Sequence, residues 1–254
     1  MGCLPALTNG EFELNHHIAV IGLGFGDEGK GTVVNRICAI TPITAVIRAN
    51  GGAQCGHNVV TDDGRHHTFT QFGSGTFHGV PTFLSKFMMV EPFALQNEAN
   101  HLASLGVEHP LSMVRISAEA LLTTPLHWEL NRWAEKQRGT DAHGTTGRGI
   151  GATAEFAELS PAVAPRMRDL HNPTKLGVKL AKLNEWVSVL TAGEVSFHHT
   201  QLAALKENYR DLSVGLVIVH DNALADFLGS GQCVFEGAQG VLLDGDYGFH
   251  PHTT

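Results

Sequence analysis

Short apolar runs alternate along this chain with longer segments in which apolar residues recur at helical spacing. The run 17–21 ends in a cluster of glycines, and after Lys30 the apolar positions keep helical spacing as far as Ile40. A buried strand, a glycine-rich turn and an amphipathic helix in this order are typical of a βαβ unit. Pro42 predicts the end of this helix, and the next strand is expected over 45–47.

The rest of the chain continues the alternation. The segments 58–61 and 67–72 flank the turn sequence Asp62-Asp63-Gly64 and predict a β-hairpin. The stretch 139–151 is rich in glycine and threonine, which favours a mobile loop that covers a ligand. Between 161 and 209 helical patches alternate with Pro and Gly, and we expect a helical insertion there. Further strands are expected over 86–90, 113–117, 216–219 and 233–235, and further helices over 92–105, 126–138 and 222–228.

This order of elements predicts an α/β fold with a mainly parallel, twisted sheet flanked by helices. We expect residues 1–15 to form an N-terminal tail and residues 16–254 to form one nucleotide-binding domain. The sequence stops at Thr254 directly after a glycine-rich loop, without a closing helix, so we expect a fold truncated at its C-terminus. In parallel sheets ligands gather at the carboxyl ends of strands, so the glycine-rich loops are the candidate sites.

Composition narrows the classes of function. The 254 residues include 17 Lys and Arg against 25 Asp and Glu, a formal net charge of −8, and 43% are hydrophobic. That apolar content is enough for a core, and an acidic chain without a basic stripe disfavours a nucleic-acid partner. Every apolar run falls well short of the roughly 18–20 residues of a membrane-spanning helix, so no membrane partner is expected.

Cysteines and the N-terminus bear on the compartment. The four cysteines show no CxxC spacing, which argues against a disulfide framework and favours a reducing environment. Residues 1–15 lack the basic start and apolar middle of a signal peptide, so we expect a cytoplasmic protein.

On the helix expected over 126–138, a set of charged residues is expected to form a solvated face with weak ion pairs: Glu129, Arg132, Glu135 and Lys136.

The first glycine-rich loop, GFGDEGKGT over 24–32, has the GxxxxGK spacing of a P-loop but carries Gly31 where a Walker A motif has Ser or Thr. Backbone amides, the following helix N-terminus and Lys30 can together cradle a phosphate. A bare carboxylate inside such a loop repels phosphate unless a metal or a proton transfer accounts for it. Asp27 is therefore a candidate base and magnesium ligand. The alternative interpretation is a tight turn whose glycines serve packing only.

Three further glycine-rich loops carry polar side chains. The second, RANGGAQCGHN over 48–58, places His57 after a flexible turn, where it could donate a proton to a phosphoryl oxygen or be an ordinary loop histidine. The third, GTTGRGIG over 144–151, offers hydroxyls and amides suited to a monophosphate. The fourth, EGAQG over 236–240, follows a strand and could present Gln239 to the edge of a base.

Taken together, GDEGKG, GG-x-x-x-GH, GTTGRGIG and EGAQG-x-LLD, in this order, resemble the adenylosuccinate synthetase family from about Ile18 to the last residue. The resemblance implies a ligase of purine nucleotide (AMP) biosynthesis that couples GTP to the joining of IMP and L-aspartate. An aspartate would take the N1 proton of IMP while O6 attacks the γ-phosphate of GTP. The amino group of L-aspartate would then displace phosphate from the 6-phosphoryl intermediate. The resemblance also implies Mg²⁺ and a homodimer.

Site residues follow from the resemblance, motif by motif. Asp27 would be the base and a magnesium ligand, His57 the general acid, and the carbonyl of Gly56 would complete the magnesium site. The residues expected to bind GTP are Gly26, Asp27, Glu28, Gly29, Lys30, Gly31, Thr32, Gly56, His57 and Asn58. The residues expected to bind IMP are Asp27, Lys30, Gln54, Cys55, Gly56, His57, Thr146, Gln239 and Thr254.

Some positions depart from the family pattern. Gln54 and Cys55 stand where the family usually has Asn and Ala, the segment 152–160 lacks the basic residues by which a partner subunit usually reaches the IMP phosphate, and 71–75 replaces a Pro-Ser-Gly turn. These departures leave open a related ligase with another purine nucleotide or amine donor. The expected truncation after Thr254 leaves open a non-catalytic or truncated purine-nucleotide-binding module. A P-loop phosphotransferase is disfavoured by Gly31 and by the lack of a clear Walker B strand.

Overall fold

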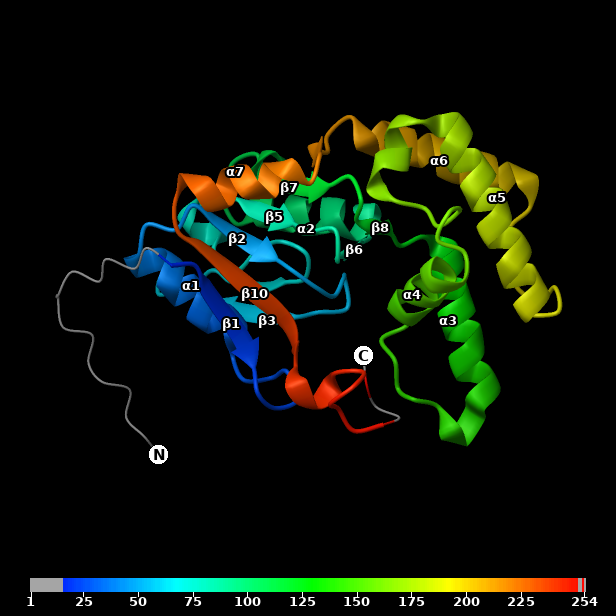
Figure 1. Ribbon diagram of the computed structural model, residues 1–254, viewed down its shortest axis with the longest axis horizontal. Coiled ribbons are helices and arrows are strands. Elements are labelled where there is room, and N and C mark those ends of the chain that lie inside the picture. The colour runs from blue at the N-terminus through cyan, green and yellow to red at the C-terminus, as the bar shows by residue number, and fades with distance from the viewer. Residues whose placement is uncertain (1–15, 251–252, 254) are drawn as a thin grey trace.

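The computed structural model describes residues 16–250 and residue 253, so the expected tail 1–15 and Thr254 lie outside the described residues. Its centre is a six-stranded sheet with the order β1-β10-β2-β5-β7-β9 (Figure 1). Every neighbouring pair of these strands is parallel, which confirms the predicted α/β class. The strands are β1 (Ile18–Gly22), β2 (Ala45–Arg48), β5 (Thr82–Leu84), β7 (Val114–Ser117), β9 (Ile218–Val219) and β10 (Cys233–Gly240).

Two helices cover opposite faces of this sheet, α1 (Lys30–Ile40) and α7 (Asn222–Ser230). Side chains of β2 alternate between the two faces because successive residues of a strand point in opposite directions. Val46 packs with Val34 of α1, whereas Ile47 belongs to a cluster with Phe83 that Phe227 of α7 covers. The four-residue strand is thus buried on both sides, which explains its purely apolar start.

The remaining helices are α2 (Pro92–Ser104), α3 (Pro125–Arg138), α4 (Ile150–Leu159), α5 (Pro173–Leu190) and α6 (His199–Ser213). Helices α5 and α6 occupy most of the stretch 161–209, and α3 and α4 lie across from the carboxyl end of β10 (Figure 1). Leu126 of α3, Phe156 of α4 and Leu183 of α5 share a core cluster separate from that under α1. Among the described helices, none has both the length and the apolar character to cross a membrane.

The predicted hairpin is present as β3 (His57–Val60) paired antiparallel with β4 (His66–Phe69). The strand expected over 86–90 is shorter: β6 (Met89–Val90) pairs with β8 (Leu121–Leu122) outside the central sheet. Strand β10 is longer than the expected 233–235, since it runs through the EGAQG motif to Gly240. Short 3₁₀ turns lie at Thr76–His78, Pro110–Met113, Gly139–Asp141, Met167–His171 and Val241–Leu243.

Candidate active site

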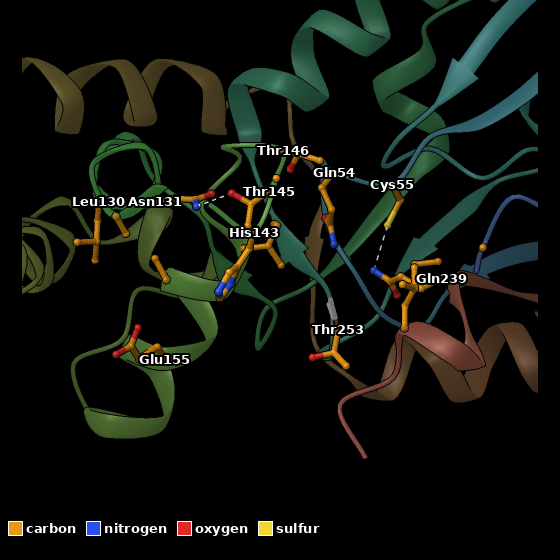
Figure 2. Close-up of a pocket in the computed structure, with 18 of the residues that line it drawn as sticks. Gln54, Cys55, Leu130, Asn131, His143, Thr145, Thr146, Glu155, Gln239 and Thr253 are labelled. Carbon is orange, nitrogen blue, oxygen red and sulfur yellow. Dashed lines mark hydrogen bonds between the residues drawn. The ribbon is translucent and has the colours of Figure 1, made fainter. Parts of the chain in front are cut away.

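Residues from all four glycine-rich loops line one pocket with a volume of about 710 Å³. One wall comes from the loops after β1 and β2 and from the end of β10, and the opposite wall from α3, α4 and the loop between them. Figure 2 shows Gln54 pointing into the space between His143 on one side and Gln239 on the other. Among the expected site residues, the pocket is lined by Gly26, Asp27, Gln54, Cys55, Gly56, Thr146 and Gln239.

The first and fourth loops touch backbone to backbone beside the pocket. A Cβ at Gly240 would lie 2.1 Å from the carbonyl oxygen of Gly24 and 2.5 Å from the nitrogen of Gly26. The N–H of Leu242 donates to the same Gly24 carbonyl at 3.0 Å. Only glycine allows this approach, so the last residue of EGAQG is fixed by its contact with the P-loop-like turn.

Two charged side chains of the first loop, Lys30 and Glu28, make hydrogen bonds to the backbone of the loop itself. Lys30 is buried, and its Nζ donates to the carbonyl of Gly26 at 2.8 Å. The carboxylate of Glu28 accepts the N–H of Gly26 at 3.0 Å and lies 3.9 Å from Lys30 Nζ. The hydrogen bond from Gly26 lowers the pKa of Glu28. Both side chains therefore hold the turn in shape.

Asp27 differs from both of its charged neighbours in the loop. Its exposed carboxylate lines the pocket and makes no hydrogen bond or ion pair with the described part of the chain. No group of three or more His, Cys, Asp or Glu among the described residues could hold a metal ion by itself. Magnesium at nucleotide sites takes one or two carboxylates and completes its shell with waters and substrate phosphates. Asp27 and Gly56, which line the same pocket, fit that kind of site.

His57 lies behind the pocket wall that Gly56 forms. The imidazole is buried, with Nδ1 2.5 Å from Oε1 of Glu236 and Nε2 3.3 Å from the carbonyl oxygen of Ala238. Both ring nitrogens thus face oxygen acceptors of β10. A phosphoryl oxygen in the pocket would have to take the place of Ala238 as the partner of Nε2.

Glu236 connects this histidine to a buried network. Its carboxylate accepts the N–H of Ser74 at 3.0 Å and the hydroxyl of Ser74 at 2.5 Å. Arg48 lies opposite Glu236 in the β2–β10 register and is itself fully buried. Burial would raise the pKa of Glu236, but the charge of Arg48 and the hydrogen bonds from His57 and Ser74 outweigh it and lower the pKa. Glu236 is therefore an ionised anchor for His57.

Amide side chains complete the pocket. Asn50 donates from Nδ2 to Oε1 of Gln239 at 3.0 Å and accepts the N–H of Ala238 at 3.1 Å. Gln239 in turn donates to Sγ of Cys55 at 3.6 Å, which fixes the orientation of its amide. Neither Oε1 nor Nε2 of Gln54 has a partner within the described chain, although both atoms are buried. Gln54 therefore offers one donor and one acceptor group to a ligand.

A family model described as adenylosuccinate synthetase matches residues 19–254. The chain belongs to the adenylosuccinate synthetase family. Among its relatives, the adenylosuccinate synthetase of Bordetella parapertussis is 32% identical over 95% of this chain and 55% of the relative. That of Pseudoalteromonas atlantica is 34% identical over 94% of this chain and 55% of the relative. The chain thus spans about half the length of the curated relatives it matches.

Solved structures of the family show the same fold. Adenylosuccinate synthetase from Plasmodium falciparum, in its fully ligated form, matches with a TM-score of 0.79 and 22% identity over 94% of this chain and 55% of that one. Succinoaminodeoxyadenylate synthetase of cyanophage S-2L, bound to dGMP and dATP, matches with a TM-score of 0.63 and 15% identity over the same shares of the two chains. These two structures show the fold, and the family model together with the curated relatives confirms the resemblance read from the motifs.

Other residues expected from the family motifs lie away from the pocket surface. Gly31 packs under His57, and Thr32 on the exposed side of α1 donates to the carbonyl of Asn58 at 3.4 Å. Gly29, at a left-handed φ of 83°, is the N-cap of α1. The structure thus divides the expected GTP-binding set between the pocket wall, buried positions behind it (Lys30, Gly31 and His57) and exposed positions (Glu28, Gly29, Thr32 and Asn58).

Sequence reasoning missed four polar residues of this site: Arg48, Asn50, Ser74 and Glu236. Arg48 ends β2, whose other residues are apolar, and Glu236 lies within β10, whose other residues are small or apolar except Gln239. A charged residue is rarely buried fully unless it is paired, so two of them within apolar strands of one sheet are a usable signal. Asn50 and Ser74 carry no comparable pattern, because their role depends on contacts with β10, far away in the sequence.

Proposed function

We propose that this chain forms the nucleotide-binding part of a GTP-dependent ligase that joins IMP and L-aspartate through a 6-phosphoryl intermediate. The observation that carries the proposal is the unpaired carboxylate of Asp27 in a pocket lined by all four family motifs. A carboxylate kept free inside an anion-binding turn needs a proton or a cation as its partner.

Each pocket residue has a role in this reaction. Asp27 takes the N1 proton of IMP as O6 attacks the γ-phosphate of GTP and GDP leaves. The amino group of L-aspartate then attacks C6 and displaces phosphate. The amides of Gln54 and Gln239 bind the purine edge, and Thr146 binds the phosphate of IMP. His57, anchored by Glu236, donates a hydrogen bond to the transferring phosphoryl group from behind the pocket wall.

Mg²⁺ would be held by Asp27 and the carbonyl of Gly56. When bound, it supplies positive charge that offsets the charge of the GTP phosphates. Lys30 keeps its hydrogen bond to the loop and orients the turn that receives those phosphates. We further propose a cytoplasmic homodimer, as the family resemblance implies.

The test is an omission assay with the full chain. The protein is incubated with GTP, Mg²⁺, IMP and L-aspartate, and phosphate release is followed as each component is left out in turn. We expect release to require all of them. Release that is indifferent to both IMP and L-aspartate would exclude the ligase, and binding of nucleotide without any release would favour the non-catalytic module.

A second candidate is a ligase of the same type acting on a different purine nucleotide. The unpaired amide of Gln54 allows it, because one donor and one acceptor can pair with the edge of a guanine as well as a hypoxanthine. The cyanophage S-2L protein with this fold was solved with dGMP bound. Replacing IMP by GMP or dGMP in the omission assay separates the two candidates by the ratio of their kcat/KM values.

A further inference from the structure

The third glycine-rich loop is hydrogen-bonded along one side of α3. The carboxylate of Glu135 accepts the N–H groups of Gly144 at 2.9 Å and Thr145 at 3.2 Å through Oε2. Its other oxygen, Oε1, accepts a hydrogen bond from Nη1 of Arg138 at 2.5 Å. The sequence predicted that Glu135 belongs to a solvated face with weak ion pairs, whereas in the structure its carboxylate holds the backbone of the loop. The predicted ion pairing on α3 is seen between Glu129 and Arg132, whose charged atoms lie 2.9 Å apart.

Asn131, one turn earlier on the same helix, holds the loop at two points. Its Nδ2 donates to Oγ1 of Thr145 at 2.9 Å, the contact drawn in Figure 2. Its Oδ1 accepts the N–H of Gly149 at 3.1 Å. Residues four and seven positions apart share one face of a helix. Asn131, Glu135 and Arg138 therefore form a continuous stripe of α3 facing this loop.

Gly149 shows how closely the loop approaches the helix. A Cβ at this position would lie 2.6 Å from the carbonyl carbon of His127 and 2.8 Å from the nitrogen of Trp128. Its φ of 73° also lies in the left-handed region that favours glycine. The pattern of the sequence predicted a mobile loop, whereas the structure docks this segment on α3 at both of its ends.

The hydrogen bonds between this loop and α3 determine which groups of the loop face the pocket. Thr145, Thr146 and Arg138 line the pocket, whereas Glu135 does not. The N–H groups of Gly144, Thr145 and Gly149 are therefore used by α3 and are not available to a ligand. Asn131 itself also lines the pocket. The hydroxyl of Thr145 accepts a hydrogen bond from Asn131, so its own proton is left to donate to a ligand.

We propose that Glu135 and Asn131 are positioning residues that fix the threonine hydroxyls of this loop for the phosphate group of a purine nucleoside monophosphate. The identity of the ligand rests on the proposed function. Neither residue needs to touch the ligand through its carboxylate or amide. They act through the loop backbone and through Thr145.

The experiment measures dissociation constants of IMP and of a non-hydrolysable GTP analogue by calorimetry, for the full chain and its variants. Glu135→Ala and Asn131→Ala should each weaken IMP binding about tenfold, since each removes two or more hydrogen bonds of the loop. Binding of the GTP analogue should change by less than about twofold, because its proposed site lies on the opposite wall. Glu129→Gln, which breaks an ion pair of similar spacing on α3, is the matched control and should change neither constant.

Glu135→Gln is the rescue variant. Its amide oxygen can still accept from Gly144 and Thr145, and only the charge opposite Arg138 is lost, so IMP binding should lie between those of the wild type and Glu135→Ala. Hydrogen exchange of the Gly144, Thr145 and Gly149 amides should speed up in the alanine variants. Unchanged IMP binding in them, or equal weakening of both ligands, would overturn the positioning role alone. A wild-type chain that binds no IMP would overturn this role together with the proposed function.

Discussion

At Gly31 a side chain of any size would meet the proposed general acid. A Cβ built there would lie 2.8 Å from the Cβ of His57 and 3.2 Å from Oγ of Ser74. The sequence showed only that this loop lacks the Ser or Thr of a Walker A motif. The structure supplies the reason: the first turn of α1 packs directly on the start of β3, so the hydroxyl of an ordinary P-loop has no room.

We expect Gly31→Ser to cost about 1–3 kcal/mol of unfolding free energy, because the added atoms must push β3 and His57 away from α1. Urea denaturation measures the change. Gly151→Ala is the control, since a Cβ at that helical glycine meets nothing within 4 Å and should leave stability unchanged or slightly higher. Equal stability of wild type and Gly31→Ser would show that this packing is not as tight as the structure has it.

Asp27 allows catalysis to be separated from folding. Its carboxylate is exposed and has no partner within the described residues, so Asp27→Asn should change the free energy of unfolding by less than about 0.5 kcal/mol. Ligase turnover should fall roughly a hundredfold or more, since an amide cannot accept the N1 proton. Turnover by the omission assay and denaturation are measured on the same preparation. Turnover retained at the wild-type rate would remove Asp27 from the role of base.

Strands β2 and β10 carry opposite charges at equivalent positions, Arg48 and Glu236, and both are fully buried. Glu236→Gln should destabilise the fold by about 3–5 kcal/mol at pH 7, because it leaves the Arg48 charge without its counter-charge. The folded pKa of Glu236 lies below its ordinary value of 4.5, so its contribution is present above pH 4.5 and lost as the pH falls through the lowered value. Denaturation at pH 7 and pH 4 should show a smaller difference between wild type and variant at the lower pH.

Helix α2 begins at a carboxyl group with the opposite shift. Burial raises the pKa of Glu91 to about 7, although hydrogen bonds from Ala94 and Phe93 and the charge of Arg148 favour its ionised form. A raised folded pKa means stability that is fully present below pH 4.5 and is lost as the pH rises to about 7. Between pH 5 and pH 8 the wild type should lose about 1–3 kcal/mol more than Glu91→Gln. Parallel stability curves for the two proteins would contradict this assignment.

Elements with a long, regular pattern could be predicted from the sequence, and short ones could not. Helix α1 and the hairpin of β3 and β4 are where the apolar spacing and the turn sequence put them. Strand β5 has three residues, too few to show a period, and α4 starts within the glycine-rich motif that hides its pattern. For the site, seven of the residues expected from the motifs line the pocket: Gly26, Asp27, Gln54, Cys55, Gly56, Thr146 and Gln239. The remaining lining residues and the supporting contacts depend on strand register and helix faces that appear only in three dimensions.

The pocket joins two parts of the molecule that have separate cores, the sheet with α1 and α7 and the group of α3, α4 and α5. A nucleotide that binds only the folded pocket should therefore stabilise the chain, by about 2.7 kcal/mol at a concentration one hundred times the dissociation constant. We expect IMP and the GTP analogue with Mg²⁺ each to raise the melting temperature. Chelation of Mg²⁺ should remove the shift caused by the GTP analogue and leave that of IMP.

Asp27→Asn should reproduce the effect of chelation on the GTP analogue, since the carboxylate is the proposed protein ligand of the cation. Glu135→Ala should have the opposite effect: it should reduce the rise in melting temperature caused by IMP and leave the rise caused by the GTP analogue unchanged. The two variants thus test by calorimetric melting alone whether the cation site of the GTP analogue and the phosphate site of IMP lie on different walls of the pocket. If both nucleotides lost their effect in both variants, the pocket would bind them as a single unit, and the division of the site between the sheet loops and the α3 loop would be wrong.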